Sequence, residues 1–171
     1  NVEKPIEKET FGYNSESYIL AVNYPEGEVR GVEVEARKDL EFMPGLLQYL
    51  SLGGNYSMID ATVEVPQSQR GALKLAGLDE ARRPMEGQPD FLMNVNATFH
   101  NEDWGFLAAL FYNVRGEVLK SGAGVGRNRD NQTQITPNIV EKRREHLNLT
   151  LEKKFFDCWS LTFRIKNILE D

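Results

Sequence analysis

The chain is dominated by short segments in which apolar and polar residues alternate one by one. A period of two is the pattern of β-strands whose two faces meet different surroundings. The alternation is clear in residues 32–37, 50–58, 91–99, 147–152 and 161–166, and weaker in residues 18–24. These segments predict antiparallel strands with one apolar and one polar face.

Residues 106–114 depart from this alternation. Phe106, Leu110 and Val114 belong to an apolar face, but Leu107 and Phe111 make the opposite face apolar too. A turn signal before the segment and a glycine-rich stretch after it favour a strand over a helix. A strand that is apolar on both faces must be covered on both. We therefore expect something inside a barrel to press against its second face.

The connections between the predicted strands alternate in length. Short links fall near residues 42–45, 101–105 and 155–159, whereas residues 66–89 and 121–138 form long links rich in Gly, Pro, Gln, Asn and Arg. Short turns at one end and long loops at the other are typical of outer-membrane barrels. Loops longer than about 15 residues are uncommon in compact soluble domains.

Aromatic and polar residues complete the prediction of the fold. Aromatic side chains gather near the predicted strand ends, as in the girdles of membrane barrels. The polar faces carry Asn, Thr, Ser, Glu, Arg and Lys, which suit a wide, hydrated interior. A lumen of that width needs about 16–22 strands, and we count about seven. The predicted fold class is all-β, with antiparallel transmembrane strands that form part of a larger barrel.

The composition excludes several other classes of protein. Of 171 residues, 40% are hydrophobic and 27% are charged, which is not a disordered composition. The net charge of −6 and the sequence pI of about 5.1 argue against a nucleic-acid partner. The lone cysteine, Cys158, provides neither an internal disulfide nor a cysteine-based metal cluster. No apolar run is long enough for a transmembrane helix, and no signal peptide is visible.

A series of short motifs resembles the C-terminal part of TonB-dependent outer-membrane receptors. The resemblance covers residues 31–171 and lies in the order and spacing of the motifs. They are GVEVEA at residues 31–36, NYS at 55–57 followed by Asp60 and Ala61, RPMEGQP at 83–89, YN at 112–113 followed by Arg115 and Gly116, and LTFRIKNILED at 161–171.

The resemblance implies active import across the outer membrane. Receptors of this family bind a scarce solute, commonly a ferric siderophore, haem, cobalamin or an oligosaccharide, and the inner-membrane TonB complex supplies the energy. The resemblance assigns residues 1–171 to the barrel, as part of about 22 strands, in the outer membrane of a Gram-negative bacterium. It implies that the plug domain, the TonB-contacting segment and the last strand or strands lie outside this sequence. The expected partners are outer-membrane lipid, TonB through that N-terminal part, and a small-molecule ligand, with no nucleic acid.

No arrangement of residues predicts an enzyme, a metal site or a cofactor. His100, which falls in a predicted short turn, and His146 are interpreted as solvated surface residues. Glu33 and Glu35 are interpreted as a polar row beside Arg37. The glycine-rich run at residues 122–126 lacks the context and the GK[ST] ending of a phosphate-binding loop, so it is interpreted as a flexible external loop.

The predicted external loops carry four arginines, Arg82, Arg83, Arg127 and Arg129. Guanidinium groups bind anionic ligands through charge-assisted hydrogen bonds. Solvated loop arginines, or contacts with lipid headgroups, explain each of them more simply. No individual ligand-binding residue is therefore assigned.

Two alternatives remain at this level. A soluble, lipocalin-like β-barrel would turn its apolar face inward around a small ligand. A passive outer-membrane porin would share the strand pattern, and only the receptor-like motifs oppose it.

Overall fold

A computed structural model describes residues 1–13, 16–75, 77–78, 81–127 and 130–169. These residues form two compact units. Unit 1 comprises Asn1–Gly31, Ile59–Asp90 and Glu117–Lys142, and unit 2 comprises Val32–Met58, Phe91–Gly116 and Arg143–Asp171. Two long strands, β4 (Glu26–Asp39) and β5 (Leu50–Glu64), contribute residues to both units.

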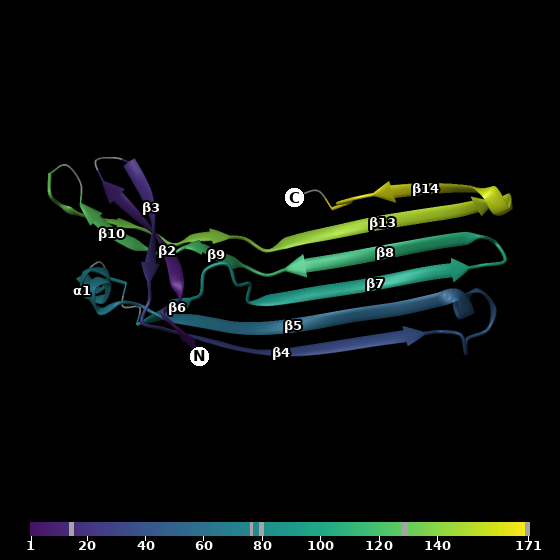
Figure 1. The fold of residues 1–171 in the computed structure, drawn as a ribbon, viewed down its shortest axis with the longest axis horizontal. Coiled ribbons are helices and arrows are strands. Elements are labelled where there is room, and N and C mark those ends of the chain that lie inside the picture. Colours follow the sequence, from purple (N-terminus) through teal and green to yellow (C-terminus); the bar gives the residue numbers. More distant parts are fainter. Residues whose placement is uncertain (14–15, 76, 79–80, 128–129, 170–171) are drawn as a thin grey trace. The chain divides into compact units, whose positions relative to one another are not determined.

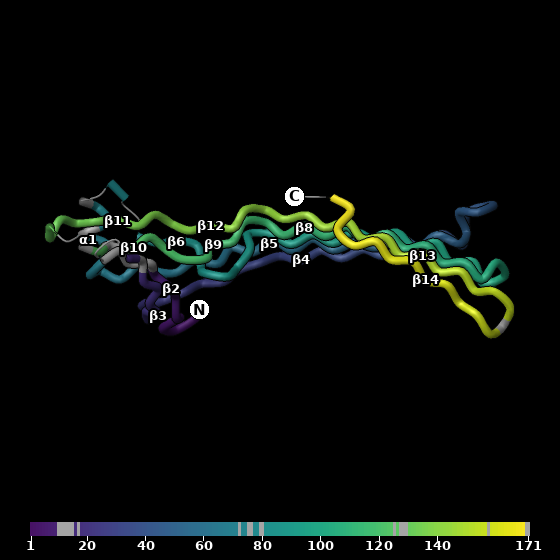
Figure 2. Tube along the Cα trace, turned by 90° about the horizontal axis from the view of Figure 1, so that it is seen from above, coloured from purple at the N-terminus to yellow at the C-terminus, as the bar shows by residue number. Residues whose placement is uncertain are grey.

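Unit 2 is an antiparallel meander. Its strands follow the order β4, β5, β7, β8, β13 and β14 (Figure 1). The last four strands span Phe91–Asn101, Phe106–Arg115, Arg144–Phe155 and Trp159–Ile165. Viewed edge-on, the strands of this unit lie in a single layer (Figure 2). The described residues of this unit therefore form no second layer that could bury either face.

Tight turns connect the strands of unit 2 at one end. Between β7 and β8, the Asn101 side chain accepts a 2.9 Å hydrogen bond from the Trp104 amide, and Gly105 has φ +56°. Glycine tolerates this left-handed conformation without steric cost. The 3₁₀ turns η1 (Gly45–Tyr49) and η2 (Phe156–Cys158) precede β5 and β14. The turn geometry thus sets the register of the meander.

Unit 1 is built from shorter elements. One sheet has the order β11 (Thr133–Thr136), β10 (Gly124–Arg127), β2 (Ile6–Tyr13) and β3 (Glu16–Asn23). A second sheet pairs β12 (Ile139–Glu141) with β9 (Val118–Ser121). The strands β1 (Val2–Glu3) and β6 (Arg82–Pro84) pair with β4 and β5, and the helix α1 spans Gln67–Leu75.

Unit 1 has a conventional hydrophobic core. Tyr24, Val63, Val65, Leu73 and Ala123 are buried together. They come from the residue after β3, the last part of β5 and the residue after it, α1, and the segment before β10. Burial of these side chains from distant parts of the sequence holds the unit together.

The structure confirms the all-β antiparallel class and the alternating strands. It also corrects three expectations. The predicted long link at residues 66–89 contains α1 and β6, and the link at 121–138 contains β10 and β11. His100, expected in a turn, lies within β7.

Candidate functional site

The first candidate surface is the apolar face of unit 2. Cross-strand pairing places Leu52 opposite Ala97, Ala97 opposite Leu110 and Leu110 opposite Leu149. Residues directly opposite each other in antiparallel strands share a face. Large side chains on this face are exposed, including Met58 at 57% and Leu161 at 65%. An exposed apolar surface of this extent marks contact with a partner or a membrane.

The strand β5 shows where this surface ends. From Leu50 to Met58 the apolar residues occupy even positions and are largely exposed. From Ala61 to Val65 they occupy odd positions and are buried in unit 1, where Val63 is 0% exposed. The exposed apolar stretch in β5 is about nine residues long, which is the length that a tilted strand needs to cross a bilayer.

Aromatic residues border the exposed face at both ends. Near the tight turns, the Phe99 ring lies 5.8 Å from Tyr49, 6.3 Å from Trp104 and 6.2 Å from Phe106. At the other end, Tyr56 and Phe91 stack with 5.9 Å between ring centroids. Such rings are stable at the level of lipid headgroups, where one end is apolar and the other is wet.

The opposite face of unit 2 is polar. Asn94 donates a 2.7 Å hydrogen bond to Asn55 and accepts a 2.6 Å bond from Asn113, so three strands are joined by one row of amides. At the next strand, His146 Nδ1 lies 3.1 Å from Asn167 Oδ1. The two faces of unit 2 therefore suit lipid on one side and water or polar protein on the other.

One aromatic residue interrupts the polar face. Phe111 lies opposite Asn96 and Asn148 and is 40% exposed. It lines a hollow of about 480 Å³ with Glu35, Arg37 and other residues of this face.

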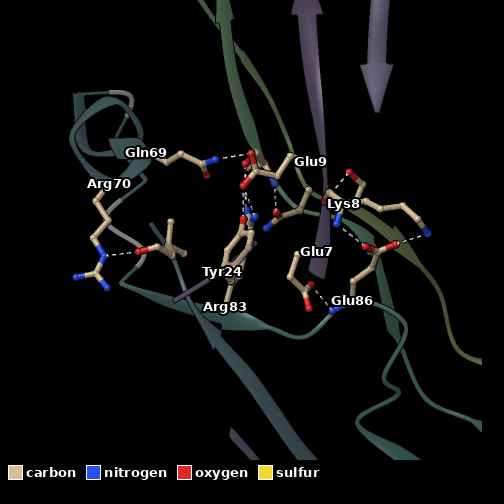
Figure 3. A network of polar contacts seen from close by, with 12 residues as sticks. Glu7, Lys8, Glu9, Tyr24, Gln69, Arg70, Arg83 and Glu86 are labelled. Atoms are coloured by element: carbon tan, nitrogen blue, oxygen red, sulfur yellow. Dashed lines mark hydrogen bonds and ion pairs between the residues drawn. The ribbon is translucent and has the colours of Figure 1, made fainter. Parts of the chain in front are cut away.

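The second candidate site is a buried polar cluster in unit 1 (Figure 3). Glu9 of β2 and Arg83 of β6 form an ion pair at 3.2 Å, and both side chains are excluded from solvent. The Tyr24 hydroxyl and the Gln69 amide donate hydrogen bonds to Glu9. Arg83 also donates a 3.0 Å hydrogen bond to the Ala123 carbonyl and lies 4.8 Å from the Tyr24 ring centroid. Arg83 thus ties together segments of unit 1 that are far apart in sequence.

Two further carboxylates accompany this pair. Glu7 is buried and accepts a 2.7 Å hydrogen bond from the Glu86 amide. The Glu86 carboxylate pairs at 3.0 Å with Lys8, whose side chain is largely exposed. Burial raises the pKa of Glu7 and the pKa of Glu9 above their usual range, while Arg83 opposes that shift. Burial also lowers the pKa of the Arg83 guanidinium.

Gly122 makes room for the buried guanidinium. A Cβ atom at this position would overlap the guanidinium group of Arg83. The neighbouring buried Arg83 Nε has no hydrogen-bond partner among the described residues. The glycine-rich run therefore has a packing role at Gly122, and its interpretation as a flexible loop is wrong for the described residues 122–126.

Unit 1 also contains a hollow of about 290 Å³. It lies between the end of β5 and β9 and is lined by both apolar residues, such as Ile59 and Leu119, and polar ones, such as Asp60 and Asn138. Pockets that enclose a whole small-molecule ligand usually measure about 300–1,000 Å³. This hollow is therefore suited to only part of a larger solute.

The comparison with protein families agrees with the two-faced sheet. Residues 9–168 match the family model described as TonB dependent receptor-like, beta-barrel. The chain belongs to this family of TonB-dependent receptors. Comparisons with curated proteins and with solved structures returned no match.

Family membership establishes the general role and location of this receptor barrel. Members are TonB-coupled receptors of the outer membrane that transport solutes rather than act as enzymes. The exposed apolar face of unit 2 is therefore the lipid face. The lipocalin-like alternative is wrong, because it required this apolar face to enclose a ligand.

The arginines expected in the loops of this receptor barrel have different environments. Arg82 is exposed and lies 3.4 Å from Glu28, as expected for a solvated residue. Arg83 is buried, so its interpretation as a solvated loop arginine is wrong. The Arg127 side chain and Arg129 lie outside the described part of the chain. The burial of Arg83 could not be predicted from sequence, because its partners Glu9 and Ala123 are distant in sequence.

The other residues considered from sequence do not come together into a site. His100 and His146 lie on different strands, and Glu33 and Glu35 are exposed on β4. The described residues contain no group of three histidine, cysteine, aspartate or glutamate side chains arranged to hold a metal ion. None of the described helices is both long and apolar enough to cross a membrane.

Proposed function

We propose that this receptor imports a scarce solute into the periplasm of a Gram-negative bacterium, with energy from TonB. A ferric siderophore, haem, cobalamin and a glycan are the candidate classes of solute. The observation that carries the proposal is the sheet of unit 2, with its exposed apolar face and its hydrogen-bonded row of Asn55, Asn94 and Asn113 on the other face. Such a sheet separates lipid from a hydrated interior when it closes into a wide barrel.

Along the chain, the segments of unit 1 occupy the connections that alternate with the tight turns, so we assign them to the cell exterior. In outer-membrane barrels the long connections face outward and the short turns face the periplasm. The buried cluster around Arg83 and Glu9 orders these long connections. The 290 Å³ hollow between β5 and β9 then offers a preformed contact for part of the solute.

Phe111 provides the contact for the plug domain in this proposal. It is exposed on the polar face and lines the 480 Å³ hollow. Burial of an exposed phenylalanine is worth roughly 1.5–3 kcal/mol. A plug domain inside the barrel supplies the second cover that the doubly apolar β8 requires.

Uptake by the intact receptor tests the proposal. Cells that express the full-length protein are offered labelled ferric siderophores, haem, cobalamin and oligosaccharides, with and without a functional TonB. We expect accumulation of one solute class that stops when TonB is absent. Equal accumulation without TonB would favour a passive porin and contradict the proposal.

A further inference from the structure

The lipid face of unit 2 carries a groove across four strands. The groove measures about 410 Å³ and is lined almost entirely by apolar groups. One row of its lining contains Lys38, Leu52, Ala97 and Leu110, and the adjacent row contains Ala36, Gly54, Val95 and Tyr112. Alanine and glycine form its floor, and the longer side chains border it.

Lys38 lies at the end of this groove nearest the tight turns. The Ser51 hydroxyl donates a 2.5 Å hydrogen bond to Asp39, and the Leu40 amide donates a 2.9 Å bond to the Leu50 carbonyl. These bonds fix the register of β4 against β5 and place Lys38 beside Leu52, on the lipid face. The Lys38 ammonium lies 5.2 Å from the Phe42 ring centroid, so it reaches toward the turn. Long cationic side chains extend in this way to the membrane interface.

The charges on the lipid face are distributed unequally between its ends. Near the turns, Lys38 and Lys153 are the charged residues on the lipid-facing strand positions of the described chain. Among the described residues, the acidic strand position on this face is Glu145, which lies opposite Val114 at the other end and forms an ion pair with Arg143 at 2.5 Å. Asp39 and Glu152 are on the polar face, since they pair with Ser51 and Leu107. The lipid-facing strand positions at the turn end therefore carry two cations, which can pair with anionic headgroups.

We propose that this groove binds one glycerophospholipid from the periplasmic leaflet of the outer membrane. An acyl chain lies over Ala36, Gly54 and Ala97, and the headgroup phosphate pairs with Lys38. The aromatic cluster around Phe99 sets the depth of the headgroup, because it occupies the same end of the sheet. The proposal depends on the location of the protein in the outer membrane and not on which solute it carries.

Lipid retention by the full-length receptor tests this site. The receptor is purified in a mild detergent, incubated with phosphatidylglycerol, and examined by native mass spectrometry. We expect one phospholipid to remain bound under conditions that strip the others. Ala97→Leu, which fills the groove, and Lys38→Gln, which removes the charge, should each lower the retained fraction at least tenfold.

Two variants on the same face serve as matched controls. Ala108→Leu changes a small lipid-facing residue outside the groove, and Lys153→Gln removes the other lysine at the same end. Both should retain lipid as the wild type does. Equal retention by Ala97→Leu and the wild type would overturn the groove. Equal retention of uncharged diacylglycerol, or a loss in Lys153→Gln as large as in Lys38→Gln, would overturn the phosphate contact.

Discussion

Arg83 shows how a single side chain organises unit 1. Its charge is fully buried and depends on Glu9, the Ala123 carbonyl and the Tyr24 ring. Removal of one partner of a buried ion pair typically costs about 3–5 kcal/mol, because the other charge is left without compensation. The position of this guanidinium is therefore tightly restricted, and its neighbours cannot change size freely.

Gly122→Ala tests that restriction. The added methyl group overlaps the Arg83 guanidinium, which is held in place by its partners. We expect unit 1 to lose roughly 1–3 kcal/mol of stability, the usual cost of overpacking. The measurement is the free energy of local unfolding, from hydrogen exchange of β2 and β6 in the full-length receptor.

A matched control changes a different glycine of the same unit. Gly71→Ala in α1 meets no atom within 4 Å and replaces glycine within a helix. It should stabilise the helix by about 0.5–1 kcal/mol. Equal effects of the two substitutions would contradict the packing role of Gly122.

Glu7 makes the stability of unit 1 sensitive to pH. Burial raises the pKa of Glu7 above its ordinary value of 4.5, and the pKa of Glu9 shifts in the same direction. The folded unit thus holds these protons more tightly than the unfolded chain. The stabilisation is complete below the ordinary pKa and declines as the pH rises through the raised pKa.

Glu7→Gln should therefore remove part of this pH dependence and stabilise unit 1 at neutral pH. The glutamine oxygen can still accept the hydrogen bond from the Glu86 amide. Hydrogen exchange of β2 at about pH 5 and about pH 7, corrected for intrinsic rates, measures the effect. Glu3→Gln, at an exposed position of β1, is the control and should leave the profile unchanged. A profile for Glu7→Gln as steep as that of the wild type would rule out this origin of the pH dependence.

At the scale of elements, alternate residues of each strand in unit 2 face two different environments, lipid on one side and a polar interior on the other. Val95 lies on the lipid face, and Thr98, three positions later on β7, lies on the polar face. An arginine at the bilayer midplane of a barrel costs about 2–4 kcal/mol, whereas the lumen accepts polar residues. We expect Val95→Arg to reduce insertion strongly and Thr98→Arg to be tolerated. The measurement is the amount of heat-modifiable receptor in the outer-membrane fraction. Strong loss of insertion in Thr98→Arg with normal insertion of Val95→Arg would contradict the assignment of the lipid and polar faces.

The strands of unit 2 could be predicted from sequence because their alternation is local information. Residues 93–99 and 147–152 carry the pattern without interruption, and the structure contains β7 and β13 there. The elements of unit 1 could not be predicted in the same way. Leu73 of α1 is buried against Val63 and Tyr24, and this contact depends on residues far away in sequence. The Arg83–Glu9 pair escaped prediction for the same reason.

At the scale of the whole molecule, the two units place similar apolar residues in different surroundings. Val63 and Leu73 are buried against protein in unit 1, whereas Met58 and Leu161 are exposed in unit 2. In lipid, every backbone hydrogen-bonding group must be paired, which a closed barrel achieves and an open sheet does not. The exposed apolar face of unit 2 is therefore stable only when the sheet is part of a complete barrel in the membrane.

In the proposed arrangement, Phe111 contacts the plug domain inside the barrel. Phe111→Asn removes an apolar contact from the polar face but leaves the lipid face unchanged, so insertion of the receptor should stay at the wild-type level. Loss of roughly 1.5–3 kcal/mol of apolar burial should loosen the plug, which makes it more accessible to added protease and lowers TonB-dependent uptake. The control, Leu110→Asn, alters the neighbouring lipid-facing residue and should impair insertion instead. Unchanged protease sensitivity of the plug together with unchanged uptake in Phe111→Asn would contradict the proposed contact between the plug domain and β8.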